Sequence, residues 1–166
     1  MPKIVFFLFA MMVISSCKDA VSDIANVQES GWEVDTDSLP AKIPVDAKAQ
    51  TILNEWLEFN ALERSFDKMY DTEFREDFVL IVEELVENQK KMEEGEYPAE
   101  FDIPQIKGRQ KIFKTYILKT KGDLEYRQDP KESIMQMIIA FNNLRNQFNV
   151  VVNNTLSDEL RTNEEN

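Results

Sequence analysis

The stretch DPKESIMQMIIAFNNLRNQFNVVVNN, from Asp129 to Asn154, decides the fold of this chain. Asp129 suits the N-cap of a helix, Pro130 suits the first helical position, and Glu132 places negative charge in the first turn. Apolar residues then recur at the three- and four-residue spacing of a helix with one buried face: Ile134, Ile138, Phe141, Leu144, Phe148, Val151 and Val152. The stretch predicts an amphipathic helix over 130–156, followed by a polar tail at 159–166 that we expect to fray.

The same helical spacing runs through residues 46–94, which contain neither glycine nor proline. Two interpretations are open. A single helix would be about 75 Å long at 1.5 Å per residue, as in a coiled-coil spacer. Two helices, over about 46–70 and 72–95, would divide near Asp71 and Thr72, which are both suitable N-caps. We favour two helices because helices in globular proteins are usually much shorter.

A loop interrupted by Gly95, Pro98 and Pro104 follows, and a further helix is expected over about 105–127. No segment shows the alternation of a β-strand. The chain is therefore predicted to be all-α, an antiparallel bundle of three or four helices over 46–158. The phenylalanines on the inward stripes are expected in its core: Phe59, Phe66, Phe74, Phe78, Phe113, Phe141 and Phe148.

The first residues have the layout of a secretory signal. One positive charge, at Lys3, precedes an unbroken apolar run from Ile4 to Ile14, and two small serines precede Cys17. As a helix this run rises about 16 Å, well short of a hydrocarbon core of about 30 Å. We do not expect it to be a permanent membrane span.

The sequence ISSC, Ile14 to Cys17, resembles the lipobox of bacterial lipoproteins. The resemblance implies cleavage of residues 1–16 as a signal peptide and acylation of Cys17 on its thiol and new amino group. Several acyl chains, such as palmitate, would anchor the protein firmly. In lipoprotein families an aspartate directly after the cysteine retains the protein in the inner membrane; Lys18 stands there, which favours the outer membrane. The alternative is an ordinary signal peptide followed by a chance cysteine.

Residues 17–45 are polar and lack a sustained period, and Pro40 and Pro44 interrupt their end. We expect a flexible tether that holds the bundle off the bilayer. Trp32 either docks back on the bundle or contacts a partner. The tripeptide at Asp37 to Leu39 resembles the O-glycosylation motif of some bacterial envelope proteins, with Ser38 as acceptor.

Composition excludes several chemistries. The net charge of −12 argues against nucleic-acid binding, which needs cationic surface. The chain has no histidine, Cys17 is its single cysteine, and no glycine-rich phosphate loop is present. No cofactor and no metal are expected. Glu83 and Glu87 share a helical face and could hold a hard cation, but a solvated acidic face is the simpler interpretation.

A basic stripe is predicted on the helix over 105–127, where Lys107, Lys111 and Lys114 share a face. Two interpretations are open. The lysines could pair with the acidic helix of 72–95 and fix the antiparallel packing, which we favour, although exposed pairs contribute little stability. Alternatively, the stripe could face anionic lipid headgroups or an acidic partner.

Asparagines form the second candidate interaction face. Asn142, Asn146, Asn149 and Asn153 are spaced 4, 3 and 4, so they line one side of the last helix, next to Arg145. Each asparagine costs roughly half a kcal/mol against alanine in a helix. One interpretation is a neutral polar flank of the bundle. The other is a recognition face, because amides both donate and accept hydrogen bonds and suit sugar hydroxyls or the backbone of a partner.

These observations predict a non-enzymatic, lipid-anchored helical protein of the bacterial cell envelope. It would act by binding a protein partner, as a scaffold, adaptor or subunit of an envelope assembly. The alternative is a periplasmic chaperone-like or inhibitor protein that binds cationic or unfolded clients, since strong acidity suits a basic target. An enzyme using carboxylates and a metal ranks third.

Overall fold

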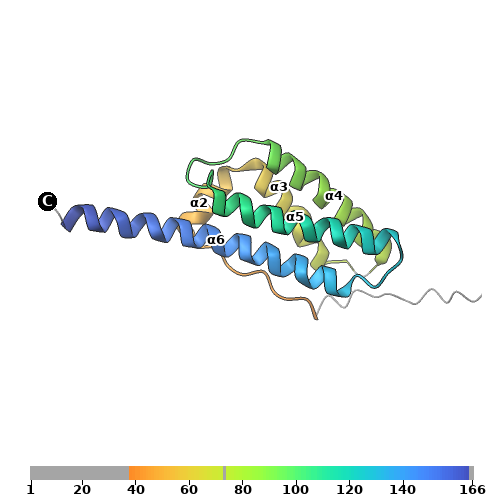
Figure 1. The fold of residues 1–166 in the computed structure, drawn as a ribbon. Coiled ribbons are helices and arrows are strands. Elements are labelled where there is room, and N and C mark those ends of the chain that lie inside the picture. Colours follow the sequence, from red (N-terminus) through yellow and green to blue (C-terminus); the bar gives the residue numbers. More distant parts are fainter. Residues whose placement is uncertain (1–37, 73, 165–166) are drawn as a thin grey trace, which may run out of the picture. The chain divides into compact units, whose positions relative to one another are not determined.

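Five α-helices and one short 3-10 helix make up the part of the chain that the computed structural model describes, residues 38–72 and 74–164, with side chains to residue 154. The predictions for the signal segment, for Cys17 and for Trp32 lie outside these residues. Figure 1 shows the elements, which are α2 (Ala47–Glu55), α3 (Leu57–Asp67), the 3-10 helix η2 (Lys68–Tyr70), α4 (Arg75–Glu94), α5 (Pro104–Glu125) and α6 (Lys131–Glu164). The predicted all-α fold is confirmed.

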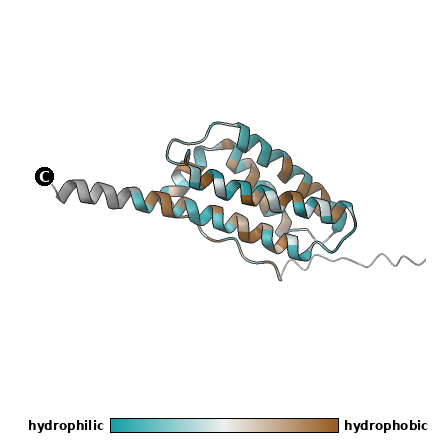
Figure 2. Cartoon of the chain, viewed as in Figure 1, coloured by the Kyte–Doolittle hydropathy of each residue, from teal (hydrophilic) through white to brown (hydrophobic). Residues whose placement is uncertain are grey.

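The long helices pack side by side, with α5 between α4 and α6, and with α3 against α4. Figure 2 shows polar and apolar residues alternating along each of them, as expected for helices with one buried face. Aromatic rings join α3, α5 and α6 in the core. The ring of Phe141 lies 4.0 Å from that of Phe66 and 5.0 Å from that of Phe113, and Phe59 meets Phe148 at 5.2 Å. All five side chains are fully buried.

The first predicted helix, over 46–70, is divided at Trp56, so that prediction is wrong. The backbone of Trp56 is extended, with φ −89° and ψ 96°, and its N–H reaches Leu53 O at 3.0 Å. The indole ring is 3% exposed and contacts Tyr97 and Phe148, with ring centroids 5.0 Å and 6.3 Å away. Burial of this large ring against a loop and α6 compensates for the interrupted helical hydrogen bonds.

The second break falls near the expected place, and the single-helix interpretation is wrong. The predicted N-caps Asp71 and Thr72 are also wrong, because α4 begins at Arg75 with Phe74 at its N-cap and no capping side chain. The backbone of Phe74 is extended there, and its side chain is 67% exposed. Phe74 is therefore not a core residue, unlike the other six phenylalanines of the predicted stripes.

The link between α5 and α6 explains where both helices end and begin. Arg127 adopts the left-handed conformation, with φ 53°, and the N–H of Gln128 donates to Asp123 O at 2.8 Å. This is the pattern of a Schellman motif, with arginine where glycine is usual. The Asp129 carboxylate accepts from the N–H of Lys131 at 3.0 Å, so its predicted capping role is confirmed. Helix α6 continues to Glu164, past the predicted end at 156.

Candidate functional site

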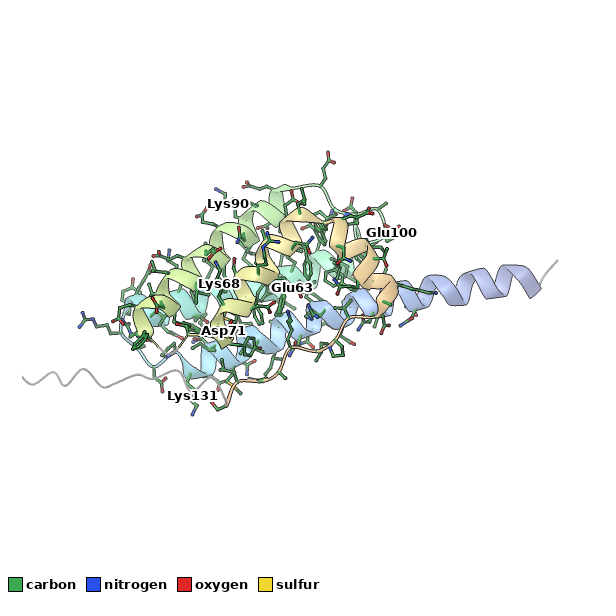
Figure 3. The ribbon with its side chains drawn as sticks, turned by 180° about the vertical axis from the view of Figure 1, so that it is seen from behind. Glu63, Lys68, Asp71, Lys90, Glu100 and Lys131 are labelled. Carbon is green, nitrogen blue, oxygen red and sulfur yellow. The ribbon has the colours of Figure 1, made fainter. Side chains whose placement is uncertain are left out.

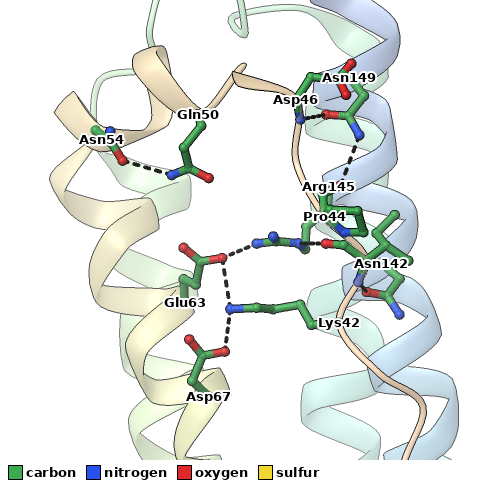
Figure 4. A network of polar contacts seen from close by, with 11 residues as sticks. Lys42, Pro44, Asp46, Gln50, Asn54, Glu63, Asp67, Asn142, Arg145 and Asn149 are labelled. Carbon is green, nitrogen blue, oxygen red and sulfur yellow. Dashed lines mark hydrogen bonds and ion pairs between the residues drawn. The ribbon is translucent and has the colours of Figure 1, made fainter. Parts of the chain in front are cut away.

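Residues 40–46, which we call the strap, run extended beside α6 and lead into α2 (Figure 4). The sequence predicted a flexible tether through residue 45. That prediction is wrong for the strap, because both α6 and the α3–η2 region bind it. At its start, the hydroxyl of Tyr70 donates to Pro40 O at 2.8 Å. Burial, and then the charge of Asp67, raises the pKa of this tyrosine, which keeps the hydroxyl protonated and able to donate.

Asn142 binds the middle of the strap through both ends of its amide. Its Oδ1 accepts from the N–H of Ile43 at 2.9 Å, and its Nδ2 donates to Ala41 O at 3.0 Å. One side chain thus satisfies a donor and an acceptor of the strap's main chain, as a neighbouring β-strand would.

Asn149 repeats this arrangement two turns further along α6. Its Oδ1 accepts from the N–H of Asp46 at 2.8 Å, and its Nδ2 donates to Pro44 O at 3.2 Å. Asn153 then donates to the Asp46 carboxylate at 2.8 Å. Asn146 differs, because it is exposed and makes no hydrogen bond to the strap among the described residues.

An ion cluster fastens the strap to α3 as well. Arg145, only 5% exposed, donates from Nε to Ile43 O at 2.7 Å and pairs with Glu63. Lys42 of the strap lies 3.2 Å from the Glu63 carboxylate and 2.5 Å from that of Asp67 (Figure 4). The guanidinium of Arg145 is therefore both charge-paired and hydrogen-bonded, as a buried cation requires.

The candidate asparagine face thus has a partner inside the chain. Asn142, Asn149, Asn153 and Arg145 hold the strap, whereas Asn146 stands outside the network. A neutral flank does not account for these bonds. Amides that donate and accept do suit an extended backbone, and in this structure that backbone belongs to residues 41–46.

Two of the three lysines of the basic stripe form ion pairs within the chain. Lys107 pairs with Asp102 and lies 5.0 Å over the ring of Tyr97, and Lys114 pairs with Glu93 at the end of α4. Lys111 is exposed and makes no ion pair among the described residues. These contacts favour the interpretation in which the chain's own acids neutralise the stripe.

The structure also contains an acidic pocket, at the end of the bundle, that the sequence did not predict. It has a volume of about 640 Å³, and the residues that line it come from α2, from the start of α3 and from the loop after α4. They are Thr51, Ile52, Glu55, Trp56, Leu57, Glu58, Glu96, Tyr97, Pro98 and Glu100. In the sequence, the glutamates on either side of Trp56 and in the loop indicate only an overall negative charge.

A second hollow, of about 610 Å³, shares Glu96 and Tyr97 with the acidic pocket and is also lined by Glu93, Asp102, Lys107 and Lys111. Tyr97 donates its hydroxyl to Gln110, and burial raises the pKa of that hydroxyl. No group of three or more His, Cys, Asp and Glu side chains is close enough to hold a metal within the described ranges. No described helix is both long and apolar enough to cross a membrane.

No protein-family model, curated protein or solved structure matches this chain. Fold and site together define its class as an all-α bundle to which an extended N-terminal strap is fastened.

Proposed function

We propose that this chain is a non-enzymatic, lipid-anchored helical protein of the bacterial cell envelope. It acts by binding, as a scaffold, adaptor or subunit of an envelope assembly at the outer membrane. The lipobox-like ISSC motif supports a lipid anchor at Cys17. The strap would connect that anchor to the bundle.

The strap is the observation that carries this proposal. An acylated Cys17 would be connected to the bundle through the strap, so a force on the anchor would reach the strap before it reached α2. The bonds from Asn142 and Asn149, together with the ion cluster of Arg145, spread that force over α6 and α3.

The test is the mass of the protein recovered from bacterial membranes after production of the full chain with its own N-terminus. We expect loss of residues 1–16 and a mass increase that corresponds to acyl chains on Cys17. Cys17→Ala should leave the chain unacylated, while Ser16→Ala keeps a small residue before the cysteine and should be processed normally. Recovery of the wild-type chain without acylation would refute the anchor.

A chaperone-like protein or an inhibitor of a cationic target is the second candidate, favoured by the acidic pocket and by the net charge of −12. The two candidates differ in what they bind. A scaffold binds one folded partner in fixed proportion, whereas a chaperone delays aggregation of many unfolded clients. Suppression of the aggregation of a heated model protein by the purified chain would favour the second candidate.

A further inference from the structure

We infer that the acidic pocket binds a basic, partly apolar peptide segment of a partner protein. The inference rests on the proposed function, because it names the surface and the class of partner through which the anchored protein would act. Figure 3 shows Glu100 at this end of the bundle, far from Asp71 and Lys131 at the other end.

Charge is the first argument. Four glutamates line the pocket, Glu55 and Glu58 around the α2–α3 junction and Glu96 and Glu100 from the loop, and no lysine or arginine lines it. None of the four forms an ion pair among the described side chains, although other acids of the bundle are paired. Four unpaired carboxylates around one hollow produce a negative potential that attracts a cation, and the overall charge of the chain adds to it.

The carboxylates are spread around the pocket and do not converge on one point. The described residues contain no group of three or more acidic ligands at metal-binding separation. A single small cation would therefore contact few of them. A segment with several arginine or lysine side chains can reach all four, because long basic side chains place their charges several ångströms apart.

The apolar part of the lining is the second argument. Leu57 is 75% exposed beside the buried ring of Trp56, and Ile52, Tyr97 and Pro98 complete the apolar surface. Exposed apolar residues next to uncompensated charge are typical of surfaces that meet a partner. A segment in which basic and apolar residues alternate would cover both parts of the lining.

Trp56 supplies an independent observation. Its indole N–H is buried without a hydrogen-bond acceptor, while the residue is 97% buried and lines the pocket. A buried donor without an acceptor is unfavourable. The nitrogen has almost no accessible surface, so a main-chain carbonyl of a bound peptide would reach it only after the side chains that cover it move.

The neighbouring hollow differs from the acidic pocket in its charge. Lys107 and Lys111 line that hollow together with Glu93, Glu96 and Asp102, and Lys107 is already paired with Asp102. That hollow therefore carries both signs of charge, whereas only acidic charges line the acidic pocket, so a basic segment is attracted more strongly to the acidic pocket.

The experiment measures binding of a short capped peptide of alternating arginine and leucine to the full chain in a non-ionic detergent. A peptide with glutamate in place of arginine is the control. The chain contains two tryptophans, so Trp32→Phe leaves Trp56 as the sole tryptophan and its fluorescence reports on the pocket. We expect the basic peptide alone to bind, to change the emission of Trp56, and to bind more weakly as salt screens the charges.

Matched variants separate the pocket from general electrostatics. The pair Glu58→Gln and Glu96→Gln removes two charges from the pocket and should weaken binding about tenfold. Glu83→Gln and Glu87→Gln remove two charges from the exposed face of α4 and should leave affinity unchanged within about twofold, because that face lies outside the pocket.

Equal losses in both pairs, or no binding of the basic peptide by the wild-type chain, would overturn the inference. Binding of the acidic peptide in the neighbouring hollow instead would also count against it. Acylation of Cys17 is measured separately. If the chain is acylated but does not bind the basic peptide, the peptide-binding inference is refuted and the proposed anchor stands. If the chain binds the peptide but is never acylated, the anchor is refuted and the peptide-binding inference stands.

Discussion

Replacing Asn142 by alanine tests the asparagine face, because Asn146 on the same face provides a matched control. Asn142→Ala removes two hydrogen bonds to the strap, at 2.9 Å and 3.0 Å. At about 1 kcal/mol net for each bond, the loss is about 2 kcal/mol. Alanine recovers about 0.6 kcal/mol of helix propensity. The expected net destabilisation is therefore about 1.4 kcal/mol.

Asn146→Ala makes the same chemical change one turn away without removing a strap contact, so it should stabilise the protein by about 0.6 kcal/mol. Urea unfolding followed by far-UV circular dichroism measures both. With a denaturant slope of about 2 kcal/mol per molar, the two midpoints should differ by about 1 M, in opposite directions from the wild type. Equal midpoints for the two variants would refute the strap contact.

Three further predictions concern the ion cluster, acid stability and the link between α5 and α6. Arg145→Met leaves Glu63 without its guanidinium partner and should lower the free energy of unfolding by about 2–4 kcal/mol; a loss under about 0.5 kcal/mol in urea unfolding would contradict it. The hydrogen bond from Lys68 lowers the pKa of Glu84, so this pair stabilises the fold above the ordinary glutamate pKa and ceases to do so as the pH falls through the lowered value. Glu84→Gln should therefore reduce the drop in melting temperature between neutral pH and pH 3, and an unchanged drop would count against the pair. Arg127→Gly should raise stability by about 0.5–1 kcal/mol in thermal unfolding, because glycine adopts the left-handed conformation without strain; a destabilised variant would show that the arginine side chain matters more.

The spacing of the asparagines located the face on α6, but the sequence did not identify what lies on it. The bond between Ile43 and Asn142 joins residues 99 positions apart, and no local pattern connects them. The cost of four asparagines in helix propensity left two interpretations open, a neutral flank and a recognition face. In the structure, hydrogen bonds to the strap account for Asn142, Asn149 and Asn153.

The break at Trp56 could not be read from the sequence for a related reason. No glycine or proline interrupts the helix there, and the residues on either side are good helix formers. The packing of the indole against Tyr97 and Phe148 sets the conformation, and both partners are distant in sequence. The acidic pocket is formed by residues at this break together with a loop, so the spacing of apolar residues could not predict it. The long apolar stripes, in contrast, predicted the core and the fold class.

Amide hydrogen exchange at Ile43 and Asp46 tests most directly the claim that the strap is fastened to α6. The N–H groups of these two residues donate to Asn142 and Asn149, whereas the N–H groups of Lys42 and Val45 make no hydrogen bond among the described residues. Slow exchange at Ile43 and Asp46, with faster exchange at Lys42 and Val45, is the predicted result. Exchange of all four amides at the rate of an unfolded chain would contradict the account.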